Sequence, residues 1–297
     1  MLRPLLLKDR EIFKRFLSLN KHQLSSYQFS NIFIWQALYK VKWEVIGDSL
    51  CVFFKDNLGI FMYLEPLGEK VNSSVVKKCF QIMDRFNKNS SISRIENVEE
   101  ENVDFYKGMG FRVKEKYPEY VYLRKELIEL KGERFKAKRR DINYFLKNYK
   151  FRVLPFSLKY KDSCLDLYNY WMFERKARYN DAVYQVLLQD SFKVLHFLFI
   201  HYKGLDFQGW IVEIQNGIRG FSLGYPLDKE TFCIFYEIAD LKIKGLSQFI
   251  FWFFCKELSS YKFINVMDDS GLENLRQVKL SYYPERLVSA YIVTQNG

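Results

Sequence analysis

Apolar residues along the first half of the chain alternate between the spacing of amphipathic helices and the spacing of buried strands. Asp9 is a candidate N-cap of the first predicted helix, 9–18, and Gly110 is a candidate C-cap of the short helix predicted at 99–109. In order, we expect helices at 9–18 and 29–38, strands at 41–47, 49–55 and 59–68, a helix at 72–87, a strand at 92–98, a short helix at 99–109, and strands at 111–117 and 119–125.

The second half repeats that order of elements. We expect helices at 161–178 and 181–202, strands at 207–215, 218–225 and 231–240, a helix at 246–258, a strand at 263–266, a short helix after Asp269, and a strand at 287–293. A repeat of about 145 residues with little identity indicates a duplicated α+β domain.

The segment 130–152 joins the two halves, and it has helical spacing at Phe135, Ile142 and Phe145. It is interpreted as a connecting helix that packs against a domain. The predicted division is therefore residues 1–128 for the first domain, 129–149 for the connecting helix and 150–297 for the second domain.

Composition supports a globular protein with large cores. The 297 residues are 48% apolar and 18% aromatic, which excludes a disordered chain, a collagen and a small disulfide scaffold. The five cysteines form no CxxC pair and are expected to be reduced thiols. The three histidines have neither the spacing of a zinc site nor that of a Ser-His-Asp triad, so no metal is expected. P-loop, Rossmann, HExxH, GxSxG and kinase signatures are absent from the sequence.

The net charge of +11 favours an anionic partner, although a basic surface that only keeps the protein soluble accounts for it equally well. The N-terminus does not have the pattern of a signal peptide, and the longest apolar runs are far shorter than the roughly 20 residues that span a bilayer. We expect a cytoplasmic monomer, with at most a peripheral hold on the inner face of the membrane.

Several stretches resemble known families. FYKGMGF at 105–111 and the order of the strands resemble the Gcn5-related N-acetyltransferase (GNAT) fold. KRRDINYF at 138–145, the stretches 221–226 and 236–246, and INVMDDSGLENLRQVKLSYYP at 264–284 resemble a bacterial family of stand-alone proteins related to the C-terminal catalytic domain of phosphatidylglycerol lysyltransferase. The resemblance covers nearly the whole chain.

That resemblance implies an α+β fold of two tandem GNAT-like domains, each a mixed central sheet flanked by helices, akin to Fem-type aminoacyl-tRNA-dependent transferases. The implied activity is transfer of an aminoacyl group from a charged tRNA to an amine or hydroxyl acceptor such as a phospholipid headgroup. The chain departs from the family pattern at Arg140, Tyr225, Ile238 and Val266. Those departures keep open a binding module without catalytic activity.

Two carboxylates are the catalytic candidates. Glu237 interrupts the apolar strand CIFYEIA, where burial is costly without a partner, and Asp269 follows the next strand. A carboxylate at these strand ends can bind the α-amino group of an aminoacyl donor or act as a general base. The alternative for Glu237 is a structural ion pair. Ser270 and Glu273 are interpreted as a capping box of the following helix.

Lys242, Lys244 and Gly245 form a degenerate Lys-x-x-Gly-x-Ser turn before a helix, where a GNAT enzyme would hold the pyrophosphate of CoA. The alternative is a basic turn before a buried helix. The weak motif argues against a standard acetyltransferase and allows a donor held in another way. The co-substrate that the resemblance implies is an aminoacyl-tRNA, and an acyl-CoA used by the second domain alone is the alternative.

Basic and aromatic residues provide the candidates for substrate binding. Lys136, Arg139, Arg140 and Asn143 share one face of the connecting helix, which suits the phosphates of a polyanion, with tRNA placed ahead of anionic phospholipid. The alternative is a solvated basic face. The substrate-binding candidates are Arg139, Asn143, Trp171, Arg175, Asn265, Arg276 and Lys279.

Overall fold

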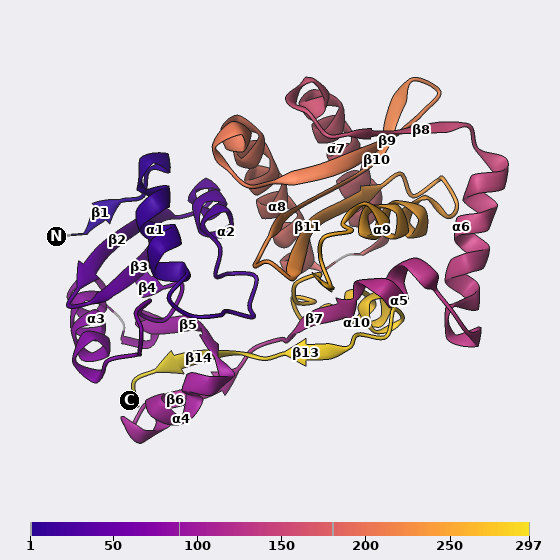
Figure 1. Ribbon diagram of the computed structural model, residues 1–297. Helices are drawn as coiled ribbons and strands as arrows, with labels where there is room; N and C mark the ends of the chain where they lie inside the picture. Colours follow the sequence, from indigo (N-terminus) through magenta and orange to yellow (C-terminus); the bar gives the residue numbers. More distant parts are fainter. Residues whose placement is uncertain (1, 89, 180, 297) are drawn as a thin grey trace. The chain divides into compact units, whose positions relative to one another are not determined.

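The computed structural model describes residues 2–88, 90–179 and 181–296, and these form two mixed seven-stranded sheets flanked by helices (Figure 1). The chain packs as two compact units. Unit 1 consists of Met1–Glu119, Asp268–Leu272 and Leu287–Gly297, and unit 2 consists of Tyr120–Met267 and Glu273–Arg286. The predicted α+β class is confirmed.

The sheet of unit 1 has the order β1-β2-β3-β4-β5-β14-β6, in which only β4 and β5 run parallel among the described strands. Its strands are β1 (Arg3–Pro4), β2 (Lys40–Ile46), β3 (Ser49–Lys55), β4 (Ile60–Met62), β5 (Arg94–Glu99), β14 (Ala290–Thr294) and β6 (Arg112–Glu115). Its helices are α1 (Arg10–Leu17), α2 (Phe29–Ile34), α3 (Ser73–Phe86) and α4 (Val103–Gly108), with 3-10 turns η1 (Leu7–Asp9), η2 (Trp35–Ala37), η3 (Ser90–Ile92) and η4 (Glu100–Asn102).

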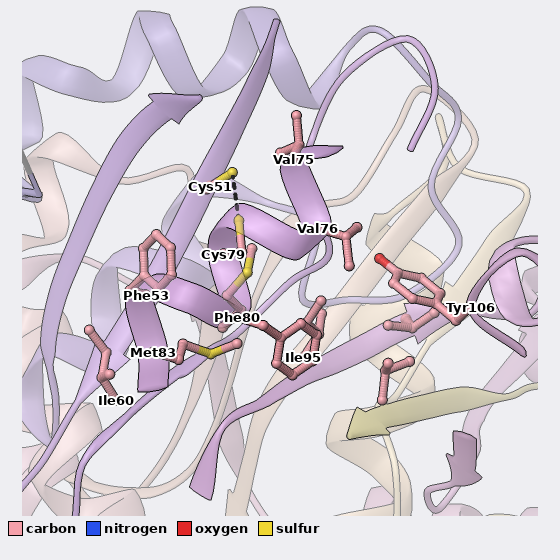
Figure 2. Close-up of a cluster of buried hydrophobic side chains, with 13 residues drawn as sticks. Cys51, Phe53, Ile60, Val75, Val76, Cys79, Phe80, Met83, Ile95 and Tyr106 are labelled. Carbon is pink, nitrogen blue, oxygen red and sulfur yellow. Dashed lines mark hydrogen bonds between the residues drawn. The ribbon is translucent and has the colours of Figure 1, made fainter. Parts of the chain in front are cut away.

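Helix α3 covers one face of this sheet because its apolar residues recur at helical spacing. Cys79 and Met83 lie one turn apart on α3 and pack with Cys51 and Phe53 of β3, which are two residues apart and so point to the same face (Figure 2). The sulfur atoms of Cys51 and Cys79 are 3.4 Å apart, a thiol hydrogen bond inside a core closed to water. As the sequence predicted, the cysteines are free thiols.

The sheet of unit 2 has the order β13-β7-β12-β11-β10-β9-β8. Its strands are β13 (Arg286–Val288), β7 (Glu119–Leu123), β12 (Phe263–Asn265), β11 (Thr231–Ala239), β10 (Gly217–Pro226), β9 (Gln208–Ile214) and β8 (Phe151–Pro155). Its helices are α5 (Arg124–Glu129), α6 (Lys136–Asn148), α7 (Lys161–Arg178), α8 (Ala182–His201), α9 (Leu246–Glu257) and α10 (Glu273–Leu280), with 3-10 turns η5 (Glu133–Phe135), η6 (Leu158–Tyr160) and η7 (Tyr202–Gly204).

The connecting segment is shorter as a helix than expected. The prediction of one helix over 130–152 is wrong at both ends, because Leu130 has a left-handed backbone (φ 47°) that ends α5, and residues 151–155 pair with β9 as β8. The helix between them, α6, packs on α9 through Phe145 and Phe249, whose ring centroids are 4.7 Å apart. The segment is therefore part of unit 2.

The order of elements repeats as predicted, but each half contributes one strand to the sheet of the other. β7, which ends the first half, pairs with β12 in the second sheet. β14, which ends the second half, pairs with β5 and β6 in the first sheet. The compact units therefore do not follow the linear division into 1–128, 129–149 and 150–297.

Candidate active site

A bulge in strand β11 sets the direction of the Glu237 side chain. In the pairing of β10 with β11, Leu223 lies opposite Tyr236, and the next residue, Gly224, lies opposite Ile234, so Phe235 is the extra residue. An extra residue reverses the alternation of side chains beyond it. Glu237 therefore joins the face that packs on α9, while Tyr236 packs on α7, where its ring lies 6.3 Å from that of Tyr168.

The Glu237 carboxylate is half-buried and has one hydrogen-bond partner among the described residues. The hydroxyl of Ser247, in the first turn of α9, donates to Oε1 at 3.2 Å. No described Lys, Arg or His lies within ion-pair distance of Glu237. The structure therefore does not have the ion pair that was the alternative explanation for Glu237. Oε2 of Glu237 has no hydrogen-bond donor within the described chain.

Burial raises the pKa of Glu237 to about 7, and the hydrogen bond from Ser247 and the positive charges of Lys138 and Lys279 oppose that rise. A carboxyl group whose pKa lies near neutrality exchanges its proton readily at physiological pH. The group can thus accept a proton from an attacking amine or hydroxyl and give it back. This is the chemistry expected of a general base.

Lys138 of α6 is a half-buried basic residue that the sequence analysis did not single out. Its amine donates to the Ser281 hydroxyl at 2.8 Å and lies 3.9 Å from the ring centroid of Tyr282. Burial lowers the pKa of Lys138, against the opposing charges of Asp141 and Glu237. Phe135, Ile142 and Phe145 form the buried stripe of this helix, and a residue at 138 falls on that stripe.

Lys279 and Asn265, two of the predicted substrate-binding residues, organise the backbone after β12. The buried Lys279 amine donates to the carbonyl oxygens of Val266 and Met267 at 2.6 and 3.0 Å. The side-chain oxygen of Asn265 accepts from the Met267 N–H at 2.7 Å. These contacts hold Met267 in a left-handed conformation (φ 62°).

Two other predicted candidates, Arg139 and Asn143, also lie on α6. The Arg139 guanidinium donates to the carbonyl oxygens of Leu130 and Gly132 and so closes the turn after α5. Asn143 is exposed on the same helix.

Candidates on α7 and α10 also belong to unit 2. The Arg175 guanidinium lies 5.2 Å from the ring centroid of Trp171, and its Nε is buried without a hydrogen-bond partner among the described residues. Arg276 is exposed on α10. A direct role of any of these residues in substrate binding stays a prediction.

The turn that carries Lys242, Lys244 and Gly245 packs against its own unit. Lys242 lies 3.7 Å from the Glu174 carboxylate, and the amine of Lys244 lies 4.7 Å from the ring centroid of Tyr144. Gly245 has φ +84° and sits against the backbone of Asp141 in α6. This contact leaves no room for a side chain at position 245.

Asp269, the second catalytic candidate, belongs to unit 1. It is buried, and its Oδ1 accepts from the Gly271 N–H at 2.9 Å. That turn positions the loop before α10. Because Glu237 belongs to unit 2, a joint role of the two carboxylates stays a prediction.

Within residues 2–88, 90–179 and 181–296, no group of three or more His, Cys, Asp or Glu side chains could hold a metal ion. Within the same residues, every helix is too short or too polar to cross a bilayer.

Comparison with known proteins places this arrangement in context. The model of the family "Phosphatidylglycerol lysyltransferase, C-terminal" matches residues 18–294. A search of the curated proteins found no match.

Solved structures share the fold over the whole chain. A conserved protein of unknown function from Bacteroides thetaiotaomicron is 26% identical, with a TM-score of 0.87 and 99% of each chain covered. L-PGS from Bacillus licheniformis is 17% identical (TM-score 0.64; 97% of this chain and 92% of that chain covered), and FemX is 10% identical (TM-score 0.64; 98% and 96%). The predicted tandem GNAT-like fold is confirmed, since a tandem GNAT protein is also similar.

Proposed function

Because this chain belongs to the family of the phosphatidylglycerol lysyltransferase C-terminal domain, we propose that it transfers an aminoacyl group from a charged tRNA to an amine or hydroxyl acceptor. Family and fold point to a GNAT-like acyltransferase. The donor and an acceptor such as a phospholipid headgroup are our proposal. It receives support from the relatives, which include L-PGS and FemX.

The observation that carries the proposal is the Glu237 carboxylate, half-buried, with one hydrogen bond and a pKa of about 7. In the proposed step, the nitrogen or oxygen of the acceptor attacks the ester carbonyl carbon of the aminoacyl group. Glu237 takes the proton of the attacking atom. The ester C–O bond to the tRNA then breaks, and the proton passes from Glu237 to the leaving ribose oxygen.

The turn before α9 supports a donor other than CoA. Its sequence, Lys-x-x-Gly-x-Ser at 242–247, is only a degenerate form of the motif with which a GNAT enzyme would hold the pyrophosphate of CoA. A tRNA acceptor end needs no such turn. The ion-pair-free state of Glu237 supports an enzyme over a binding module, because a structural glutamate at this depth would be paired.

The test is a transfer assay with the full chain, tRNA charged with isotope-labelled amino acids, and candidate acceptors identified by mass spectrometry of co-purifying molecules. Glu237→Gln is expected to lower the rate at least about 100-fold while the protein stays folded. Glu213→Gln is the matched control, since Glu213 lies on β9 of the same sheet and is ion-paired at 2.5 Å with Arg152 on the edge strand β8. Full activity of Glu237→Gln, or transfer from acetyl-CoA, would overturn the proposal.

A further inference from the structure

Helices α7 and α8 of unit 2 pack against each other in antiparallel directions. The Tyr168 hydroxyl in the middle of α7 donates to the Leu188 carbonyl oxygen of α8 at 3.1 Å, and its ring lies 5.6 Å from that of Phe192. Tyr179, directly after α7, packs edge-to-face on Tyr184, near the start of α8, at 5.6 Å. The last turns of α7 therefore lie beside the first turns of α8.

That end of the helix pair exposes apolar side chains. Val183 and Val186 of α8 are 68% and 55% exposed, and Leu187 beside them is 37% exposed. The spacing of three and four residues puts them on one outer face of the helix, whereas Tyr184 between them is buried. Phe173, within the last two turns of α7, is 69% exposed. Isolated exposed apolar residues are ordinary, but four at one end of a helix pair are typical of a docking surface.

Basic side chains surround these four residues, which we call the apolar end. Three cations lie in the last turn of α7: Arg175, Lys176 and Arg178. The Glu174 carboxylate lies 4.0 Å from Arg178 and 3.7 Å from a fourth cation, Lys242, in the turn before α9. Asp181 uses its carboxylate to cap α8. Four cations against two acids leave a net positive charge beside the apolar end.

This combination matches the chemistry of an anionic bilayer surface. Apolar side chains of an interfacial helix enter the boundary between headgroups and acyl chains, while Lys and Arg contact the anionic headgroups. A nucleic acid would use the cations and leave Phe173 and Val183 in water. A second copy of this chain, packed on the same surface, would bring two sets of like charges together.

We propose that the apolar end of α7 and α8 inserts into the surface of an anionic phospholipid bilayer, with Lys176 and Arg178 at the headgroup phosphates. The inference deepens the proposed function and rests on it for one point, that the acceptor is a phospholipid headgroup. Docking itself involves no transfer step. Insertion is shallow and reversible, because a few side chains at one end of a helix pair reach only the headgroup boundary.

The experiment is co-sedimentation of the full chain with vesicles of equal parts phosphatidylglycerol and phosphatidylcholine. Changing Phe173, Val183 and Val186 together to Ser should lower the partition coefficient about 100-fold, since each side chain contributes about four- to fivefold when it leaves water in part. The matched control changes Phe86, Leu58 and Val45 to Ser. These are exposed residues of unit 1, again one aromatic and two aliphatic, and their loss should leave binding unchanged.

A second variant tests the charges. Lys176→Ala with Arg178→Ala should lower binding to the mixed vesicles about tenfold and leave binding to pure phosphatidylcholine vesicles unchanged. Equal binding of the unaltered chain to both kinds of vesicle, no binding to either, or an equal loss in the unit 1 control would overturn the proposal. So would a dimer in solution that the serine variant converts to a monomer, because a second copy would then cover the apolar end.

Hydrogen exchange of the unaltered chain replaces the serine variant if that variant does not fold. Vesicles should slow exchange in the last turns of α7 and the first turns of α8, and unchanged exchange there would overturn the proposal. Vesicle binding without transfer activity would refute the proposed function and leave the docking surface intact. Transfer to an acceptor in solution without vesicle binding would refute the docking surface and leave the proposed transfer intact.

Discussion

The α-carbon of Gly245 lies against the carbonyl oxygen of Asp141, so a β-carbon at position 245 would overlap that oxygen. The backbone of Gly245 is also left-handed, with φ +84°. Alanine there must move α6 or the start of α9, which together carry Lys138 and Ser247. We expect Gly245→Ala to lower the free energy of unfolding by clearly more than the roughly 1–2 kcal/mol that a left-handed backbone costs alone, as measured by denaturant unfolding.

Gly132 provides a matched control for that prediction. It has almost the same backbone, φ +85°, belongs to the same unit, and has open space where its β-carbon would be. Gly132→Ala should therefore show the conformational cost alone, about 1–2 kcal/mol. If Gly245→Ala and Gly132→Ala lower the free energy of unfolding equally, the packing of the turn on α6 contributes nothing to stability.

A buried carboxyl in unit 1 should make stability depend on pH. Glu65 accepts hydrogen bonds from Tyr27 and Asn102, each at 3.0 Å, and burial and the nearby charge of Glu99 raise its pKa to about 7. The folded state thus binds this proton more tightly than the unfolded state. The contribution of this tighter proton binding to the free energy of unfolding is fully present below the pKa of the unfolded state and is lost as the pH rises through about 7. The free energy of unfolding should change by about 3 kcal/mol over this range.

We therefore expect Glu65→Gln to leave stability unchanged near pH 4 and to raise it above pH 7, as followed by thermal unfolding across pH. Glu96 tests the opposite sign: it is half-buried, and although burial opposes the shift, Lys116 and Arg94 lower its pKa. Glu96→Gln should lose stability at neutral pH, where the carboxylate is ionised in both states, and much less at low pH. A Glu65→Gln variant that is less stable at pH 8 would contradict the assignment.

We expect the basic residues of α6 to bind the phosphates of a polyanion such as tRNA. Testing this requires a variant that removes the charge and leaves the fold intact. Arg139 is unsuitable, because it closes the turn after α5. Lys136, Arg140 and Lys147 are exposed on α6. Changing these three to Ala should weaken tRNA binding and reduce the slope of log K against log salt by about 0.7–0.9 for each phosphate that the variant no longer neutralises.

Filter binding of tRNA at several salt concentrations measures both effects. The control removes the same charge from α3, where Lys77, Lys78 and Arg85 are exposed. If both variants lose affinity equally, binding follows the net charge of +11 and not the helix. If affinity for anionic vesicles falls instead of affinity for tRNA, the surface binds lipid.

Acetyl-CoA should not stabilise the protein. A ligand present at a hundred times its Kd adds about 2.7 kcal/mol to the free energy of unfolding, which is a readily measured rise in Tm. Because the turn at 242–247 is only a degenerate form of the pyrophosphate-binding motif, we expect no rise in a thermal-shift titration. A clear rise would favour the acyl-CoA alternative for the second half of the chain.

Hydrophobic spacing was sufficient to predict the order of elements and to single out Glu237, because a carboxylate in an apolar strand conflicts with burial. The same reasoning did not predict that Lys138 is half-buried, because its neighbours Arg139 and Arg140 made the segment resemble a solvated face. Its position on the stripe of Phe135 and Phe145 was the available signal. Arg139 and Lys279 bind backbone carbonyl oxygens. Which carbonyl oxygen a side chain meets depends on the fold, so the residue type alone does not predict it.

The strand exchange was equally hidden, since EYVYL of β7 has the apolar pattern of a buried strand whichever sheet receives it. One consequence concerns synthesis of the chain. β13, the last strand of the second sheet, ends at Val288, and β14, which lies between β5 and β6 of the first sheet, begins at Ala290. Neither sheet can therefore be completed before residues 286–294 have left the ribosome.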